Sequence, residues 1–146
     1  MGKLYIAYGS NMDESQMACR CPDAGIVGTG TVEGYRLLFK GGRDFAYATI
    51  EPEEASQVPV LVWEISDKDE GNLDRYEGYP KFYYKKEIPV LVNGECKEAM
   101  VYILDERNPL NRPSKQYHQI LTAAYQKYGF DETVLIRALQ ESCCGI

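Results

Sequence analysis

The sequence Leu4-Tyr5-Ile6-Ala7-Tyr8-Gly9-Ser10-Asn11-Met12 joins an apolar run to a turn near the start of the chain. The apolar run predicts a buried strand over residues 3–8. Glycine lets the backbone approach a ligand closely or take positive φ, and the side chains of Ser10 and Asn11 can fix the bend by local hydrogen bonds. Consecutive N–H groups then point at one place, so the turn can hold an anion. The same residues also fit a simple strand-to-helix turn whose side chains cap the next helix.

The end of a helix is predicted in a second segment, Leu73-Asp74-Arg75-Tyr76-Glu77-Gly78-Tyr79-Pro80. Gly78 is typical of a helix C-cap, and Pro80 blocks continuation. Negative charge is disfavoured at a helix C-terminus, so Glu77 lacks the usual electrostatic reason for its position. Surrounding aromatic residues could desolvate it, which would raise its pKa and suit it to proton transfer near neutral pH. The alternative is a solvated surface carboxylate.

Outward from these two segments, the sequence predicts a strand-rich section between two helices. A short helix over residues 13–20 is capped by Asp13 and ends near Pro22. Strands are predicted over residues 26–32, 35–41, 45–50 and 58–65, because β-branched or aromatic runs alternate there with glycine, proline or charged turns. Ser66 and Asp69 resemble a capping box that opens a helix over residues 66–76. This helix would present Glu77.

The second half of the chain predicts one hairpin followed by two helices. Strands over residues 82–92 and 97–104 flank Asn93-Gly94, a strong hairpin signal, so they should pair antiparallel. Ser114 and Asp131 can each cap a helix with apolar residues at helical spacing, the first of which is closed by Gly129. Strands and helices are largely segregated, which predicts a single α+β domain over residues 1–146 with a closed or strongly curved sheet flanked by helices.

Length and charge narrow the function classes. The 146 residues carry a formal net charge of −6 from interspersed acids and bases, so a nucleic-acid partner has little electrostatic support. No window approaches the roughly 18 consecutive apolar residues that a membrane span needs, and the N-terminus shows no export-signal pattern. We therefore expect a soluble cytoplasmic protein without a membrane partner.

The cysteines do not predict a metal site or a disulfide framework. Five of them, an odd number, occur together with a single histidine, and no CxxC spacing is present. Reduced thiols are therefore the expectation, and no metal is predicted. A thiol-based redox function stays open as a hypothesis. It requires an accessible thiolate of low pKa in either the Cys19/Cys21 pair or the Cys143/Cys144 pair.

Taken in order along the chain, several short motifs resemble the gamma-glutamylcyclotransferase-like family, and the match runs over nearly the whole chain. The first and fourth motifs are specific together, while the others add support through their order and spacing. The motifs are Tyr8-Gly9-Ser10-Asn11-Met12, Arg20-Cys21-Pro22, Ala48-Thr49-Ile50, Leu73-Asp74 with Glu77-Gly78, a tyrosine six or seven residues beyond Glu77, and Pro113-Ser114-Lys115-Gln116-Tyr117.

The resemblance implies a small mixed β-barrel with peripheral helices that releases 5-oxoproline from a small-molecule γ-glutamyl compound, without a cofactor. The substrate's α-amine would attack its own γ-carbonyl, with Glu77 as general acid and base. The anion-binding turn would hold the α-carboxylate or the developing oxyanion, and further tyrosines would line the pocket. The implied substrate-binding residues are Tyr8, Gly9, Ser10 and Asn11 of the turn, then Tyr84 or Tyr83, and Tyr117. A monomer or a homodimer is expected.

The chain departs from the resemblance at one place that bears on the substrate. Members acting on free γ-glutamyl amino acids tend to have glycine before the Ala-Thr-Ile motif, whereas this chain has Phe45-Ala46-Tyr47. A bulky ring there would reshape the leaving-group side of the pocket. A different class of function also remains open, namely a non-catalytic module that binds a γ-glutamyl or carboxylate metabolite.

Overall fold

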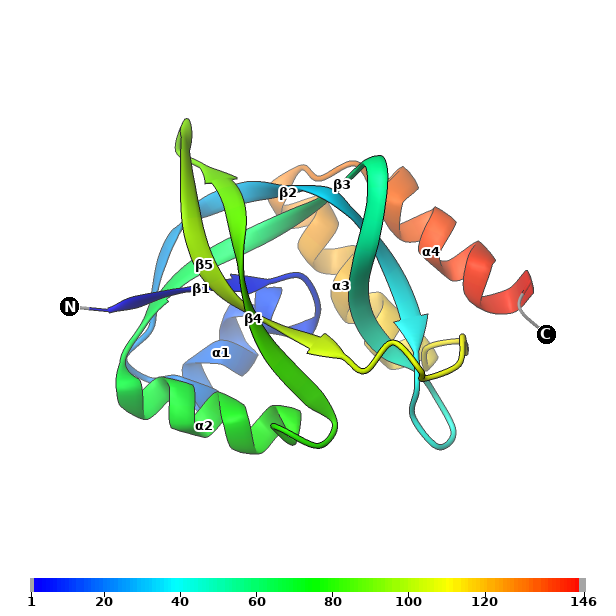
Figure 1. Cartoon of the computed structure of the whole chain (residues 1–146), viewed down its shortest axis with the longest axis horizontal. Helices are drawn as coiled ribbons and strands as arrows, with labels where there is room; N and C mark the ends of the chain where they lie inside the picture. The colour runs from blue at the N-terminus through cyan, green and yellow to red at the C-terminus, as the bar shows by residue number, and fades with distance from the viewer. Residues whose placement is uncertain (1, 145–146) are drawn as a thin grey trace.

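Five strands wrap into a closed barrel in the computed structural model, which describes residues 2–144 and, of residues 143 and 144, only the backbone (Figure 1). The order around the barrel is β1-β3-β2-β4-β5, and every pairing is antiparallel except the one between β1 and β5. This arrangement confirms the predicted α+β class and the mixed barrel with peripheral helices. The strands are β1 (Lys3–Ala7), β2 (Gly25–Lys40), β3 (Tyr47–Ile65), β4 (Tyr83–Val92) and β5 (Glu95–Leu104).

Over residues 2–144, four α-helices and one short 3-10 helix lie around the barrel. In Figure 1, α1 and α2 lie together at one end, while α3 and α4 lie together on the other side, where α4 packs on β2. The predicted N-caps at Asp13, Ser66 and Ser114 are confirmed, as is the capping box with Asp69. The elements are η1 (Ser10–Met12), α1 (Glu14–Arg20), α2 (Asp67–Glu77), α3 (Lys115–Tyr128) and α4 (Glu132–Cys144).

The four strands predicted between residues 26 and 65 are wrong in number, because the structure has two long strands instead. β2 and β3 form one extended hairpin that pairs from Gly25 with Glu64 to Lys40 with Tyr47. Register is lost between the pairs Glu33–Gln57 and Tyr35–Pro52, so residues 53–56 bulge out opposite Gly34, whose φ is +80°. The glycine and the charged run therefore mark a bulge that bends both strands without ending either.

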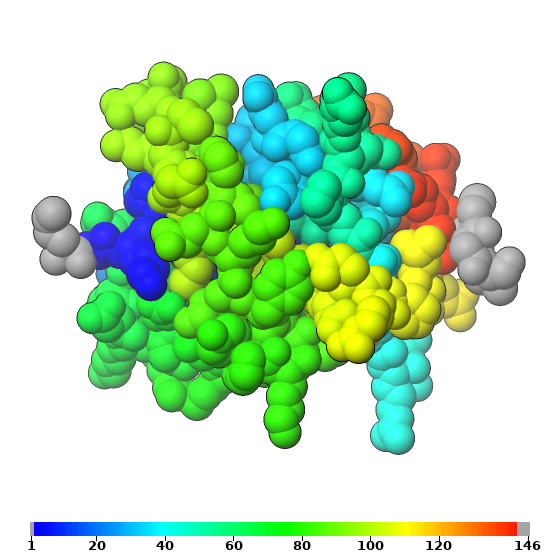
Figure 2. Space-filling model, in the orientation of Figure 1, coloured from blue at the N-terminus to red at the C-terminus, as the bar shows by residue number. Residues whose placement is uncertain are grey.

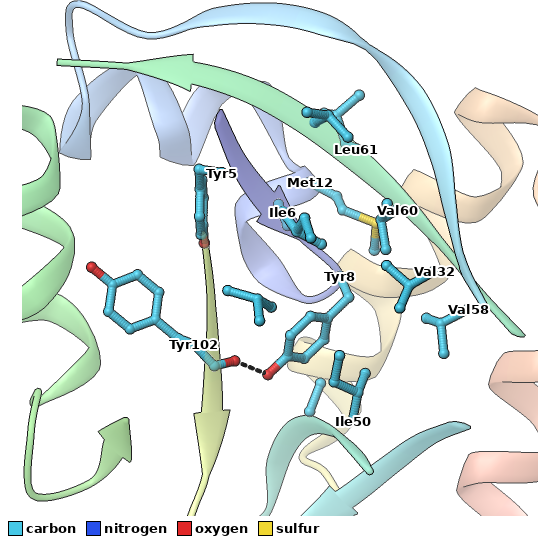
Figure 3. Packing of buried hydrophobic residues seen from close by; sticks show 14 of the residues in the cluster. Tyr5, Ile6, Tyr8, Met12, Val32, Ile50, Val58, Val60, Leu61 and Tyr102 are labelled. Carbon is cyan, nitrogen blue, oxygen red and sulfur yellow. Dashed lines mark hydrogen bonds between the residues drawn. The ribbon is translucent and has the colours of Figure 1, made fainter. Parts of the chain in front are cut away.

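The core fills the barrel and continues under the helices as one cluster of buried side chains. Figure 3 shows Ile6, Tyr8 and Met12 facing Val32 and Val60 across the interior. The β4–β5 hairpin turns at Asn93 and Gly94, both with positive φ, as the sequence predicts.

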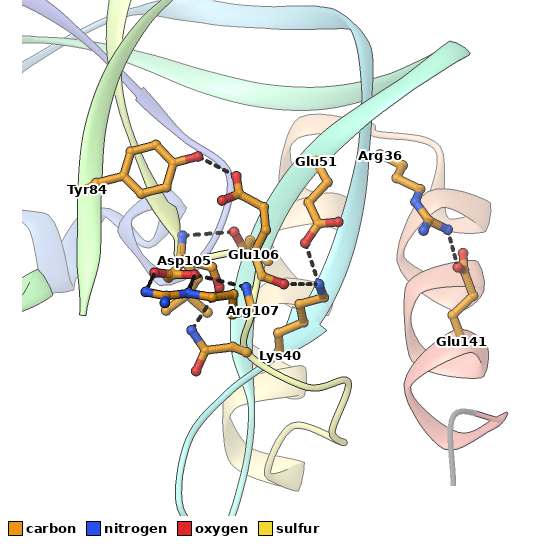
Figure 4. A network of polar contacts seen from close by, with 11 residues as sticks. Arg36, Lys40, Glu51, Tyr84, Asp105, Glu106, Arg107 and Glu141 are labelled. Atoms are coloured by element: carbon orange, nitrogen blue, oxygen red, sulfur yellow. Dashed lines mark hydrogen bonds and ion pairs between the residues drawn. The ribbon is translucent and has the colours of Figure 1, made fainter. Parts of the chain in front are cut away.

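The loop over residues 105–113 is fastened to the strands beside it. Lys40 pairs with Leu110 and Ala46 with Pro113 through isolated backbone bridges. Figure 4 shows the side chains of this region, in which the Lys40 ammonium group donates to the Glu106 carbonyl at 3.1 Å. These contacts hold the loop against the barrel on the side where β3 begins.

Candidate active site

A cavity of about 180 Å³ opens where the end of β1 meets the start of β3, the end of α2 and the start of α3. It brings together two segments that are over sixty residues apart in the chain. The lining residues are Tyr5, Ile6, Tyr8, Gly9, Ser10, Asn11, Tyr47, Ala48, Tyr76, Glu77, Phe82, Tyr83, Tyr102 and Tyr117. Of the residues proposed from the sequence, Tyr8, Gly9, Ser10, Asn11, Glu77 and Tyr117 thus share one cavity.

The turn after β1 is a single turn of 3-10 helix whose N-terminus lies at the cavity. Its internal bonds run from the Met12 N–H to the Gly9 carbonyl and from the Asp13 N–H to the Ser10 carbonyl. The N–H groups of Ser10 and Asn11 donate to no acceptor within residues 2–144. Backbone donors left free beside a cavity are suited to an anion or a carbonyl oxygen.

The side chain of Asn11 fixes this turn through hydrogen bonds to two other side chains. Its Nδ2 donates to the Tyr5 hydroxyl at 2.9 Å, and its Oδ1 accepts from Arg20 at 2.5 Å. The indole N–H of Trp63 donates to the Asn11 carbonyl at 3.1 Å. Arg20 also lies over the ring of Tyr76, with 3.6 Å between the guanidinium carbon and the ring centroid. The Arg20-Cys21-Pro22 motif therefore supports the site from α1 without lining the cavity.

Glu77 is the last residue of α2 and the only carboxylate that lines the cavity in the described part of the chain. Gly78 follows in the left-handed conformation at φ 70°, which ends the helix and lets the chain turn away. The Glu77 carboxylate has no hydrogen-bond or ion-pair partner among residues 2–144. Burial raises the pKa of Glu77 to about 7, and the nearby charge of Arg20 opposes this rise only in part.

Three tyrosine hydroxyls are fixed by backbone groups around the cavity. The Tyr8 hydroxyl donates to the Tyr102 carbonyl at 2.6 Å (Figure 3), and the Tyr83 hydroxyl donates to the Ala48 carbonyl at 2.9 Å. The Tyr117 hydroxyl instead accepts from the Ala48 N–H at 3.1 Å. Tyr117 therefore keeps its own proton for a further acceptor, while Tyr8 and Tyr83 keep lone pairs. Burial raises the pKa of all three, so they stay protonated.

Gly9 is required by close packing at this point. A Cβ on Gly9 would lie 3.1 Å from the Tyr117 hydroxyl oxygen and 3.5 Å from the Ala48 Cβ. The glycine thus lets β1, β3 and α3 converge on the cavity.

Of the two alternatives that the sequence offered on β4, Tyr83 lines the cavity and Tyr84 does not. Successive residues of a strand face opposite sides, so only one of these two adjacent tyrosines faces the cavity. The Tyr84 hydroxyl donates to Glu106 in an exposed contact (Figure 4).

Tyr5, Tyr76 and Tyr102 line the cavity although the sequence did not identify them as site residues. Tyr5 and Tyr8 come from the same stretch as the anion-binding turn, and Tyr76 precedes Glu77. No local signal marked Tyr102, because residues 99–104 of β5 are all buried and do not alternate.

Of the described cysteines, Cys21 does not fit the redox hypothesis. Cys21 is buried, and its burial raises the thiol pKa to about 12, the opposite of a reactive thiolate. Cys19 and Cys96 are exposed free thiols, and the side chains of Cys143 and Cys144 lie outside the described part. Within the described residues, no three histidine, cysteine or acidic side chains cluster as metal ligands, and no helix is long and apolar enough to cross a membrane.

In this closed mixed barrel, the first turn and the end of α2 meet in one cavity. This is the fold of the cyclotransferases. Residues 5–127 match the family model described as "Gamma-glutamyl cyclotransferase, AIG2-like", and the chain belongs to this family.

Solved structures agree with this assignment. A structure titled "Gamma-glutamyl cyclotransferase" is 25% identical, with a TM-score of 0.78 over 88% of this chain and 81% of the other. An uncharacterized protein from Homo sapiens is also 25% identical, with a TM-score of 0.77 over 88% of this chain and 80% of the other. A gamma-glutamyl cyclotransferase specific to glutathione from yeast shares the fold at 12% identity and a TM-score of 0.67, over 97% and 95% of the two chains. Comparison with curated proteins gave no match.

Proposed function

We propose that this protein is a gamma-glutamyl cyclotransferase that converts a small γ-glutamyl compound into 5-oxoproline and an amine, with Glu77 as the general acid and base. One observation carries the proposal, which is that the unpartnered carboxylate of Glu77 shares a cavity with the free N–H groups of Ser10 and Asn11. A base for the substrate ammonium and donors for its oxygens are the two functions that this ring closure needs.

Proton transfer begins the reaction. Glu77 as a carboxylate takes a proton from the α-ammonium, and the freed amine attacks the γ-carbonyl carbon to form a C–N bond. The second proton of this nitrogen is lost as the bond from carbon to the leaving nitrogen breaks. The leaving nitrogen gains both protons and departs as an ammonium ion, so Glu77 ends the cycle as a carboxylate. A pKa of about 7 suits both directions of transfer at neutral pH.

Donors around the cavity would stabilise negative charge on the substrate. The N–H groups of Ser10 and Asn11, together with the remaining proton of the Tyr117 hydroxyl, can hold the α-carboxylate or the oxygen of the tetrahedral intermediate. The lone pairs of the Tyr8 and Tyr83 hydroxyls can accept from the ammonium. Because amine and carbonyl belong to one bound molecule, the cavity needs only to hold the bent conformer.

The test is release of 5-oxoproline, followed by mass spectrometry, from a panel of γ-glutamyl amino acids and γ-glutamyl amines. In the Glu77→Gln variant we expect release to fall by at least about a hundredfold, which is the lower range for loss of an acid–base group. Glu87→Gln is the matched control, since Glu87 is exposed on β4 and makes no contact with the cavity.

Circular dichroism must show that both variants keep the wild-type fold. Turnover that is unchanged in Glu77→Gln would overturn the assigned role. Saturable binding of the panel compounds to the wild type without any release would instead favour the binding module.

A further inference from the structure

Aromatic side chains form the outer part of the cavity and remain partly open to solvent. Tyr47 and Tyr76 line it with 43% and 46% of their surface exposed, and Phe82 is partly buried between them and the barrel. We call these three residues the aromatic rim. Phe45 and Tyr79 are exposed in the same two connections, β2–β3 and α2–β4. Both connections lie at the same lower edge of the molecule, and side chains project from each (Figures 1 and 2).

Within the rim, Tyr47 and Phe82 contact each other, and Tyr47 also contacts Tyr117 deeper in the cavity. Tyr47 meets Phe82 with a centroid distance of 6.0 Å and Tyr117 with 5.5 Å, both edge to face. Such packing fixes the rings without hydrogen bonds, so their exposed surfaces are held in place. Large exposed apolar side chains that gather beside a cavity mark a surface for a ligand.

The cavity volume sets which part of a substrate can be buried. An engineered cavity of about 150 Å³ accepts benzene, and the cavity here, at about 180 Å³, is slightly larger. The γ-glutamyl acyl group has a few more atoms than benzene, so its volume is about what the cavity can hold. The leaving amine must then extend from the inner part of the cavity to the aromatic rim.

The charges near the rim decide between leaving groups. A leaving amino acid carries its own carboxylate, which needs a cation or a set of donors. Among the described residues, no lysine or arginine lines the cavity, and Arg20 is engaged by Asn11 and the Tyr76 ring. Arg43 and Lys81 belong to the neighbouring connections, but both are exposed, and water and salt weaken such charges.

We propose that the preferred leaving group is an apolar amine without a carboxylate, best an aromatic one, and that Tyr47 and Phe82 select it. This proposal rests on the cyclotransferase function proposed above. The rim gives an apolar amine two ring faces to contact, whereas it gives a carboxylate no partner.

Matched substrates test the proposal. We would compare γ-glutamylphenethylamide with γ-glutamylphenylalanine, which differ by one carboxylate, and with γ-glutamylethylamide, which lacks the ring. We expect kcat/KM for the phenethylamide to exceed that for each of the other two by about tenfold, the size of an aromatic contact. Phenylalanine preferred over phenethylamine as leaving group would overturn the proposal, and so would equal values for the phenethylamide and the ethylamide.

Variants of the rim give a second readout. Tyr47→Ala and Phe82→Ala should each raise KM for the phenethylamide by several-fold more than for the ethylamide, and Tyr47→Phe should keep the wild-type ratio, because the ring supplies the contact. Ile136→Ala on α4, an exposed apolar residue outside the cavity, is the control. An unchanged ratio in both alanine variants would contradict the proposal. Absence of 5-oxoproline from all three substrates would instead count against the cyclotransferase function itself.

Discussion

Glu77 combines an unfavourable position with an unpartnered charge, which is how a carboxylate is prepared for proton transfer. It terminates α2, where the helix carbonyls point, and the cavity removes part of its solvent. Burial raises its pKa from the ordinary 4.5 to about 7. Burial therefore has two effects: it destabilises the charged form of Glu77, and it gives the carboxyl group a pKa suited to the proposed proton transfer.

The pH dependence of the reaction follows from this pKa. In the proposed mechanism the carboxylate is the active form of the free enzyme, so protonation of Glu77 below pH 7 would remove the base. We expect kcat/KM to fall about tenfold per pH unit below an inflection near pH 7. A pH profile measured on one γ-glutamyl substrate checks this. An inflection near 4.5, the value of an ordinary carboxyl group, would contradict it.

Whereas kcat/KM should rise with pH up to about 7, the free energy of unfolding should fall over the same range. The folded protein binds the proton of Glu77 more tightly than the unfolded chain, so stability is lost as pH rises from 4.5 to 7 and the loss is complete above 7. Glu77→Gln should therefore raise the free energy of unfolding by up to about 3 kcal/mol at pH 8 and by almost nothing at pH 4. Urea unfolding at both pH values measures the difference. An equal gain at both would show that the charge is not its cause.

Gly9 gives a residue-scale test of the packing around the cavity. In Gly9→Ala the new Cβ displaces the Tyr117 hydroxyl from the Ala48 N–H. We expect kcat/KM to fall by about tenfold or more, since small displacements in an active site cost up to about a hundredfold. Steady-state kinetics measure the loss.

The matched control for this variant is Gly71→Ala. Gly71 lies within α2, and a Cβ there meets no atom within 4 Å. This change should leave activity intact and stabilise the protein by about 1 kcal/mol through helix propensity. Wild-type activity in Gly9→Ala would contradict the assigned packing.

At the scale of elements, α2 carries Glu77 and is attached to three strands by charged side chains. Glu70 accepts from Lys3 of β1 at 2.9 Å and from Lys85 of β4 at 2.8 Å. Asp74, one turn before Glu77, accepts from the Tyr102 hydroxyl of β5 at 2.6 Å and from Lys85 at 3.1 Å. These bonds fix the end of the helix that bears the carboxylate.

Removal of Asp74 should weaken this attachment. Asp74→Ala leaves the Tyr102 hydroxyl without its acceptor and should lower the free energy of unfolding by roughly 1.5–3 kcal/mol, the range for a bond to a charged group. Chemical denaturation measures it. Glu95→Ala, which breaks the exposed Lys97–Glu95 pair, should cost under about 1 kcal/mol and serves as the control. Equal losses in the two variants would contradict an anchoring role for Asp74.

Element ends were predictable from the sequence wherever local chemistry sets them. Ser66 with Asp69, Ser114, Gly129 and the Asn93-Gly94 turn act through bonds within a few residues, so their effect is visible in the sequence. The join of β2 and β3 into two long strands was not predictable in this way. Charged residues 51–57 resemble a turn, and only pairing with β2 on either side of the bulge keeps them in a strand.

At the scale of the whole molecule, one core cluster joins the barrel to α1, α2, α3 and α4. We therefore expect a single cooperative unfolding transition, as predicted for one domain over residues 1–146. Calorimetry should give an enthalpy of about 100 kcal/mol near 60 °C, from roughly 0.7 kcal/mol per residue. The calorimetric and van't Hoff enthalpies should agree. Two resolved transitions would contradict a single domain.

The sequence was sufficient to predict the kind of site, a carboxylate with an anion-binding turn, but not all the residues that line the cavity. Glu77 stood out because negative charge is disfavoured at a helix C-terminus, and residues 8–11 stood out because a turn rich in backbone donors follows an apolar strand. Tyr102 did not, because its place in the cavity depends on how β5 closes the barrel. The sequence left Tyr84 and Tyr83 as alternatives because two adjacent tyrosines differ only in which side of β4 they face, and register decides that.

The parallel seam between β1 and β5 has a consequence for biosynthesis. β1 leaves the ribosome first, yet its partner strand follows some ninety residues later, at the pair Tyr5–Met100. At typical elongation rates, the anion-binding turn waits roughly 5–20 s for Tyr117. Until β5 is made, the edge of β1 that will pair with it is an open template for strands of other chains. Nascent chains stalled before residue 95 should therefore be the species most prone to aggregate, and the ones that depend most on chaperones.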